Sequence, residues 1–171
     1  PAAPIYTSMF WSSAMPASYR GWDIRCSFLD RWPLVKRYHP WFLPFYPLAF
    51  ESFRLSGFDL VISNKSAFCH GVITAPETTH VCYCLTPTRF LWQSHNYMAR
   101  EDIALPAELA LLPVLNYLRT WDRLAADRVD AFVGISRAVR DRIRKYYRRE
   151  AEVIYPPVDL SQFQPCDQAD D

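Results

Sequence analysis

The sequence predicts an α/β fold in which a parallel sheet is flanked by helices. Four short apolar runs are bounded by polar residues or prolines, as is typical of strands buried on both faces. Segments with helical periodicity follow the second and third runs, and this alternation indicates βαβ units. The four runs are residues 59–63, 80–84, 131–135 and 152–155, and residues 5–9 and 23–28 are weaker strand candidates.

The segment of residues 32–50 is rich in aromatic side chains and is broken by prolines. Because proline interrupts a helix, we expect short helices here that cover one end of the sheet. The prolines are Pro33, Pro40, Pro44 and Pro47.

A longer helix is predicted between the second and third runs. Its apolar residues recur at three- and four-residue spacing, which places them on one face. They are Leu111, Leu115, Leu118, Trp121 and Ala125. Pro113 predicts a kink or a start near the N-terminal end of this helix.

A second helix is predicted after the third run. Ser136 is a good N-cap, because its hydroxyl can accept a hydrogen bond from the first turn. Val139, Ile143 and Tyr146 form a narrow apolar stripe, and the helix should end near Tyr147.

Composition excludes several classes of protein. With 171 residues the chain suits one well-buried domain. A formal charge of +1 argues against a dedicated nucleic-acid-binding domain. Four glycines are too few for Gly-rich nucleotide loops, and no GxGxxG or Walker pattern occurs. No run approaches the ~18 apolar residues of a membrane span.

The cysteines argue against a disulfide framework, since their number is odd and their spacing irregular. A reducing cytoplasm fits this pattern better. The five cysteines are Cys26, Cys69, Cys82, Cys84 and Cys166.

Polar side chains follow three of the predicted strands at their carboxyl ends, where open α/β sheets bind ligands. The three loops begin at Asn64-Lys65-Ser66, at residues 85–89 and at Ser136-Arg137. Their hydroxyl, amide and cationic groups suit sugar hydroxyls or phosphates, and the N–H groups after Ser136 favour an anion. Ordinary turn and cap roles are the alternative, which we favour for Ser136 taken alone.

Four stretches of the chain resemble family 4 glycosyltransferases, in the subgroup of O-antigen mannosyltransferases. The string YCLTPTRFLW, residues 83–92, is similar to the family motif CYCHTPxRYxW. The others are FDLVISNKSAFCHGVIT (residues 58–74), WDRLAADRVDAFVGIS (residues 121–136) and VIYPPVDLSQFQP (residues 153–165). Their order and spacing match the family over nearly the whole chain.

This resemblance implies the GT-B architecture, in which two Rossmann-like domains face each other. Residues 1–155 are then expected to form the N-terminal, acceptor-side domain, truncated at its N-terminus because the family's Gly-rich loop is missing. Residues 156–171 are expected to lead towards a missing C-terminal donor-binding domain. The piece alone is expected to be inactive.

The resemblance also implies a reaction. A hexose, with mannose favoured, would pass with retention from a sugar nucleotide such as GDP-mannose or a UDP-sugar to a glycan or polyprenyl-linked acceptor. No metal or other cofactor is expected, so positioning and cationic or N–H groups at the leaving phosphate would provide catalysis. We expect a cytoplasmic enzyme, with possible peripheral contact at the inner face of the cell membrane, and no nucleic-acid partner.

Seven residues are candidates for binding substrate, and no catalytic residue is assigned. They are Thr86, Arg89, Asn64, Lys65, His70, Ser136 and Arg137. The family often has a histidine where this chain has Leu85, and leucine can neither donate a hydrogen bond nor titrate. His70 is either a substitute for that histidine or a structural residue.

One further pattern has two competing interpretations. His80, Cys82 and Cys84 alternate on one strand face near Cys69 and His70, which permits a zinc site. No CxxC pair occurs, and cysteine packs readily in buried strands, so packing is the favoured interpretation.

Two segments are candidates for membrane contact. The basic helix of residues 137–149 is more simply explained as a solvated face. The aromatic segment of residues 41–50, which follows Arg31, Lys36 and Arg37, would dock on a membrane, cradle a lipid or pack against the sheet. A non-catalytic α/β module that binds a sugar or nucleotide is the alternative to an enzyme.

Overall fold

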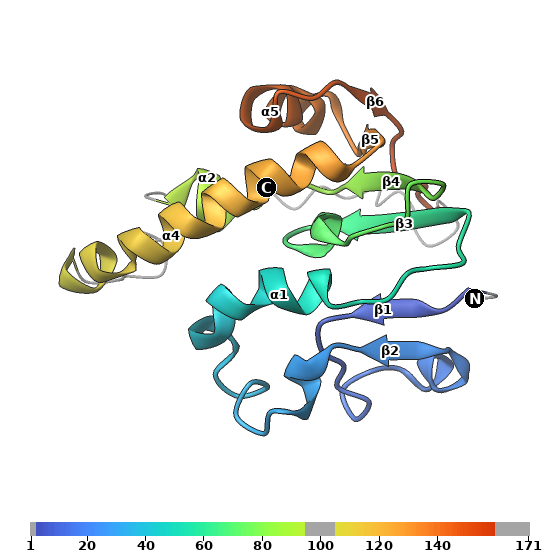
Figure 1. The fold of residues 1–171 in the computed structure, drawn as a ribbon, viewed down its shortest axis with the longest axis horizontal. Coiled ribbons are helices and arrows are strands. Elements are labelled where there is room, and N and C mark those ends of the chain that lie inside the picture. The colour runs from blue at the N-terminus through green and yellow to red at the C-terminus, as the bar shows by residue number, and fades with distance from the viewer. Residues whose placement is uncertain (1–2, 95–104, 160–171) are drawn as a thin grey trace, which may run out of the picture.

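The computed structural model describes residues 3–94 and 105–159. Its strands form a two-stranded sheet, β1-β2, and a four-stranded sheet of order β3-β4-β5-β6, and every pairing is parallel. The strands are β1 (Ile5–Thr7), β2 (Ile24–Cys26), β3 (Leu60–Lys65), β4 (Thr79–Cys84), β5 (Ala131–Gly134) and β6 (Ala151–Val153). Figure 1 shows the strand arrows of both sheets pointing the same way. The predicted α/β fold is confirmed, with its strands divided between two sheets.

Two strands end at residues other than those predicted. β3 extends to Lys65, because Asn64 and Lys65 pair with Tyr83 and Cys84 of β4. These two residues were expected in a loop, and that expectation is wrong. β6 ends at Val153, two residues before the predicted end.

Four α-helices are described: α1 (Tyr46–Glu51), α2 (Arg89–Trp92), α4 (Leu105–Ala125) and α5 (Arg137–Tyr147). Short 3₁₀ helices are η1 (Ala17–Gly21), η2 (Phe28–Arg31), η3 (His39–Phe45), η4 (Cys69–Gly71) and η5 (Ala126–Arg128). None of the helices within the described ranges combines the length and apolar character needed to cross a membrane.

The connections between successive strands of the larger sheet cover one of its faces. Right-handed crossovers that step in one direction, from β3 to β6, place η4, α4 and α5 on the same side. Burial agrees, since Cys82 and Cys84 of β4 have no exposed surface, whereas Leu60 and Ile62 of β3 point to the open face.

The larger core cluster joins the N-terminal half of the chain to α4. Tyr46 and Phe50 of α1 pack with Phe68, and Leu118 and Trp121 of α4 complete the cluster. The expected short helices of residues 32–50 are therefore present as η3 and α1, and one side of α1 is buried.

The predicted apolar face of α4 is largely confirmed. Leu115, Leu118, Trp121 and Ala125 are buried, but Leu111 is exposed. Pro113 lies inside a helix that already begins at Leu105, so the predicted start at this proline is wrong.

The start of α5 is confirmed and its apolar stripe is corrected. The Ser136 hydroxyl caps the helix by accepting from Val139 N–H. Val139, Ile143 and Tyr147 are the buried residues. Tyr146 lies beside them and stacks on Trp92, with ring centroids 4.9 Å apart.

A glycine fixes the contact between η4 and α4. A Cβ at Gly71 would overlap the indole ring of Trp121, which is itself held by a 2.8 Å hydrogen bond from its Nε1 to Glu51. We predict that Gly71→Ala lowers the unfolding free energy by about 1–3 kcal/mol through overpacking. Gly21→Ala is the control, since no atom lies within 4 Å of a Cβ there. Chemical denaturation measures both, and equal stability of the two variants would contradict the prediction.

Candidate functional site

The carboxyl ends of three neighbouring strands lie at the same level of the sheet. Lys65 of β3 is opposite Cys84 of β4, and Cys84 is opposite Gly134 of β5. The loops that follow therefore leave the sheet side by side, at the edge where open α/β sheets bind ligands. This register brings the predicted residues of all three loops to one edge.

The loop after β5 is closed by the start of α5. The Ser136 hydroxyl oxygen lies 3.3 Å from the Val139 nitrogen that donates to it. Gly134 permits this tight turn, since a Cβ there would lie 3.2 Å from the Arg140 nitrogen. Arg137 is the first residue of the helix and is exposed. The N–H groups of this first turn favour an anion.

The loop after β4 carries Thr86 and Arg89. Thr86 is half-buried, and its hydroxyl donates to the Pro87 carbonyl at 3.1 Å. Arg89 is exposed, whereas Thr88 between them has no exposed surface. The loop thus presents a guanidinium to solvent and is anchored from below through Thr88. Asn64, on the neighbouring strand, is also exposed.

A buried carboxylate anchors this loop. Asp122 of α4 has no exposed surface. Its side chain accepts hydrogen bonds from Thr88 Oγ1 at 2.8 Å, from Trp92 Nε1 at 2.7 Å and from the Tyr147 hydroxyl at 2.7 Å. These donors belong to the loop after β4, to α2 and to α5, so one carboxylate joins three parts of the structure to α4.

Lys65 is the cationic partner of this carboxylate. Its Nζ lies 3.7 Å from Asp122 Oδ1 and donates to Thr88 Oγ1 at 3.0 Å. The side chain has no exposed surface. The sequence placed Lys65 in a loop that contacts substrate. The structure places it beneath the loop because β3 continues to this residue, and its Nζ contacts Thr88 and Asp122 there.

His70 is also buried beneath the site and has no exposed surface. It lies in η4, where its Nε2 donates to the Asp122 carbonyl oxygen at 3.1 Å and its ring stacks on Tyr147. Burial, together with the charge of Lys65, lowers the pKa of His70 to about 3, so the ring is neutral. Of the two interpretations of this histidine, the structural one agrees with its complete burial.

The ionisation of Asp122 follows from its partners. Burial by itself raises the pKa of a carboxyl group. Lys65 and the hydrogen bonds from Trp92 and Tyr147 outweigh burial, and the pKa of Asp122 lies below its ordinary value. Burial and the nearby carboxylate raise the pKa of Tyr147 well above its ordinary value, which keeps the phenol protonated as a donor.

The sequence interpretation missed Asp122, Thr88 and Tyr147. A signal for Asp122 was present, since this position lies four residues after Leu118, on the predicted apolar face of the helix. A carboxylate on a buried face requires partners. Two of its partners, Trp92 and Thr88, lie 30 and 34 residues away in the chain, so sequence spacing could not identify them.

The residues considered as zinc ligands have other partners. His80 Nε2 lies 2.9 Å from Ser63 Oγ, and Cys82 and Cys84 pack in the core cluster under α5. Within residues 3–94 and 105–159, no three His, Cys, Asp or Glu side chains are placed to hold a metal ion. The four cysteines in these ranges are free thiols, and Cys166 lies outside them.

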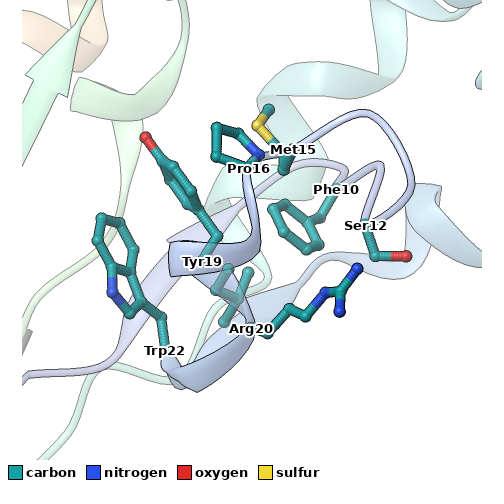
Figure 2. A pocket seen from close by; sticks show the side chains of 8 residues that line it. Phe10, Ser12, Met15, Pro16, Tyr19, Arg20 and Trp22 are labelled. Atoms are coloured by element: carbon teal, nitrogen blue, oxygen red, sulfur yellow. The ribbon is translucent and has the colours of Figure 1, made fainter.

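A hollow of about 320 Å³ is lined by the connection between β1 and β2 and by Ile24, the first residue of β2. Figure 2 shows the rings of Phe10, Tyr19 and Trp22 along it, with Ser12 and Arg20 on the same side. Aromatic walls with a few polar groups are typical of sites for small organic ligands. Tyr19, Arg20 and Trp22 of this hollow directly precede the amino end of β2, which begins at Ile24.

Parallel strands flanked by helices form a Rossmann-like α/β domain, which is consistent with the N-terminal domain of a GT-B fold. The family model Glycosyltransferase Family 4 matches residues 11–162. The chain therefore belongs to this family, and the family resemblance seen in its motifs is confirmed. No curated protein and no solved structure matches the chain.

We predict that the buried pair of Lys65 and Asp122 is strongly coupled. Asp122→Ala leaves the lysine charge buried without its partner and should cost about 3–5 kcal/mol of unfolding free energy. The double variant Lys65→Met with Asp122→Ala should lose less than the sum of the single variants Lys65→Met and Asp122→Ala, because it buries no unpaired charge.

The exposed pair of Arg123 and Asp127, at 2.7 Å, provides the control for this cycle. Asp127→Ala should cost less than about 1 kcal/mol. Denaturant unfolding measures all variants, and additive losses at Lys65 and Asp122 would contradict the predicted coupling.

Two buried histidines should make stability depend on pH. Burial lowers the pKa of His70 to about 3 and that of His80 to about 4, whereas an unfolded histidine has a pKa of about 6.5. Below about pH 6.5 the unfolded chain therefore binds protons that the folded protein does not. Stability is highest above this pH and should fall towards pH 4, by up to about 1.4 kcal/mol per pH unit for each histidine.

Denaturant unfolding between about pH 7.5 and pH 4.5 measures this slope. His80→Gln should reduce the slope of unfolding free energy against pH by up to about 1.4 kcal/mol per pH unit, the contribution of one bound proton. An unfolding free energy that stays constant over this range would show that the folded protein protonates these rings as readily as the unfolded chain does.

Proposed function

We propose that this chain is the acceptor-side domain of a retaining hexosyltransferase that uses a sugar nucleotide without a metal ion. The observation that carries the proposal is the loop after β4, which presents Thr86 and Arg89 at the carboxyl edge while Asp122 holds Thr88 beneath it. Membership of the glycosyltransferase family supplies the reaction class. The resemblance of residues 83–92 to the motif of O-antigen mannosyltransferases favours mannose.

The proposed chemistry depends on charge that develops on the leaving nucleoside diphosphate. The acceptor hydroxyl attacks the anomeric carbon on the face from which the diphosphate leaves, the C–O bond to the diphosphate breaks, and the hydroxyl proton passes to the departing diphosphate oxygen. Arg89 and the N–H groups after Ser136 are suited to stabilise this negative charge. Thr86, Asn64 and Arg137 are suited to bind sugar hydroxyls or phosphate oxygens.

Lys65 and His70 take a different part in the proposal. Both lie beneath the loop, so they position Thr88 and Asp122 rather than contact substrate. The position of Thr88 in turn fixes the directions of its neighbours Thr86 and Arg89. Such pre-organisation matters because a small displacement of a charged group costs much of its effect in the transition state.

The hollow near β1 is the proposed site for a sugar unit of the acceptor. The rings of Phe10, Tyr19 and Trp22 offer apolar walls, and Ser12 and Arg20 offer polar groups for hydroxyls. We further propose that residues 156–171 lead to a donor-binding domain. Residues 160–171 lie outside the described part of the chain.

The test uses the protein expressed from its complete reading frame. Release of nucleoside diphosphate is measured with GDP-, UDP- and ADP-sugars in excess EDTA, with and without glycan acceptors. We expect release to persist in EDTA, and we expect Arg89→Ala to lower kcat by about 10²–10³, as loss of a charge-stabilising donor does. Thr86→Ala should have a smaller effect of the same kind.

Arg54→Ala is the matched control, since this exposed arginine lies before β3, at the amino end of the sheet. It should leave kcat unchanged. No release with any donor by a folded protein would favour a non-catalytic sugar- or nucleotide-binding module. Activity that EDTA abolishes would contradict the metal-free mechanism.

A further inference from the structure

The segment that follows β2 and continues through α1 exposes large apolar side chains to solvent. Six of them are exposed by more than a third, and together we call them the aromatic patch. The patch comprises Trp41 (82% exposed), Leu34 (59%), Leu48 (56%), Tyr38 (44%), Phe45 (43%) and Trp32 (37%). Exposed apolar groups gathered in one region mark interaction surfaces, whereas scattered ones do not.

Ring contacts join the two ends of this segment. The ring centroid of Trp32 lies 5.6 Å from those of Phe42 and Phe45. On α1, Tyr46 is buried in the core, whereas Leu48 faces solvent. One side of the segment therefore packs against the core and the other side faces solvent. The exposed side chains belong to a segment that is held in place by these contacts.

Basic residues outnumber acidic ones around the patch, since the flanking Asp30 and Glu51 are both paired with basic side chains. Residues 31–50 include Arg31, Lys36 and Arg37 and no acidic residue. Lys36 is paired with Asp30 at 3.0 Å. Arg31 and Arg37 are exposed and form no ion pair within the described ranges. The rim of the patch is therefore positive.

The other basic surface, on α5, differs because no exposed apolar stripe accompanies its charges. Arg144 is paired with Glu150 at 2.7 Å, and Arg140 with Asp141 at 2.9 Å. The apolar stripe of this helix is already buried against the sheet. α5 therefore has no exposed apolar side that could enter a membrane. This agrees with the interpretation of its basic side as a face in contact with solvent.

We propose that the aromatic patch docks the protein on an anionic lipid bilayer. Tryptophan and tyrosine concentrate at the membrane–water interface, because each combines an apolar ring with a polar group. Exposed arginines are attracted by anionic headgroups. The proline-broken segment offers neither a strand edge nor a regular groove of the kind that binds peptides, which favours lipid over a protein partner.

The position of the patch is consistent with a membrane-bound substrate. The segment follows the carboxyl end of β2, and Figure 1 shows it on the side to which the strand arrows point. Thr86 and Arg89 lie at the carboxyl edge of the neighbouring sheet. Docking nevertheless follows from the patch alone and does not depend on the proposed transfer activity.

Cosedimentation with vesicles tests the proposal. The protein is mixed with vesicles of phosphatidylcholine alone or with about a third of phosphatidylglycerol, which supplies the anionic charge. We expect binding to the anionic vesicles, reduced about tenfold by Trp41→Ser through lost apolar contact. Arg31→Ala and Arg37→Ala should each reduce it about fivefold.

Leu124→Ser and Lys145→Ala are the matched controls, since both residues are exposed and lie on α4 and α5 away from the patch. They should bind as the unmodified protein does. A second measurement uses vesicles that contain brominated lipid, which quenches the fluorescence of tryptophans that enter the bilayer. The variant Trp41→Phe keeps an aromatic ring at position 41 and should still bind, but its tryptophan fluorescence should be quenched less than that of the unmodified protein.

Failure to bind either vesicle, or equal loss in the patch and control variants, would overturn the proposal. Self-association that Trp41→Ser abolishes, measured by sedimentation equilibrium without vesicle binding, would instead identify the patch as a contact between protein copies. The transfer assay is independent of both outcomes, because it uses water-soluble donors.

Discussion

The burial of one carboxylate governs the organisation of this domain. Asp122 has no exposed surface, and a charge removed from water is stable only when it is paired and hydrogen-bonded. Lys65, Thr88, Trp92 and Tyr147 meet that requirement. Because they come from β3, from the loop after β4, from α2 and from α5, satisfying one charge fixes the relative positions of four parts of the chain.

This arrangement separates the residues that hold the site from those that face solvent. Thr88 is bound to Asp122 and Lys65, and its neighbour Arg89 is exposed. The loop is therefore rigid where it meets the core and open where a ligand would approach. The proposed role of Arg89 requires such a loop, because a transition state is stabilised best by a charge that need not reorganise during the reaction.

The N-terminal half follows a different rule. Its aromatic residues divide between the core, where Tyr46 and Phe50 pack, and the surface, where Trp41 is mostly exposed. Short helices broken by prolines cannot turn every side chain inward, so composition alone does not decide which rings are buried. The same division yields both a stable junction with α4 and a surface suited to a partner.

The sequence by itself determined the parallel strands, the N-cap at Ser136, most of the buried face of α4 and the family. These features depend on neighbours a few residues apart, which periodicity and motifs record. It also identified the loops that reach the carboxyl edge. Only the tertiary structure decided that Lys65 and His70 lie beneath the site and that Asp122 holds its loop, because burial depends on contacts between residues distant in the chain. A buried charge and an exposed one have the same letter in a sequence, and the packing around each of them makes the difference.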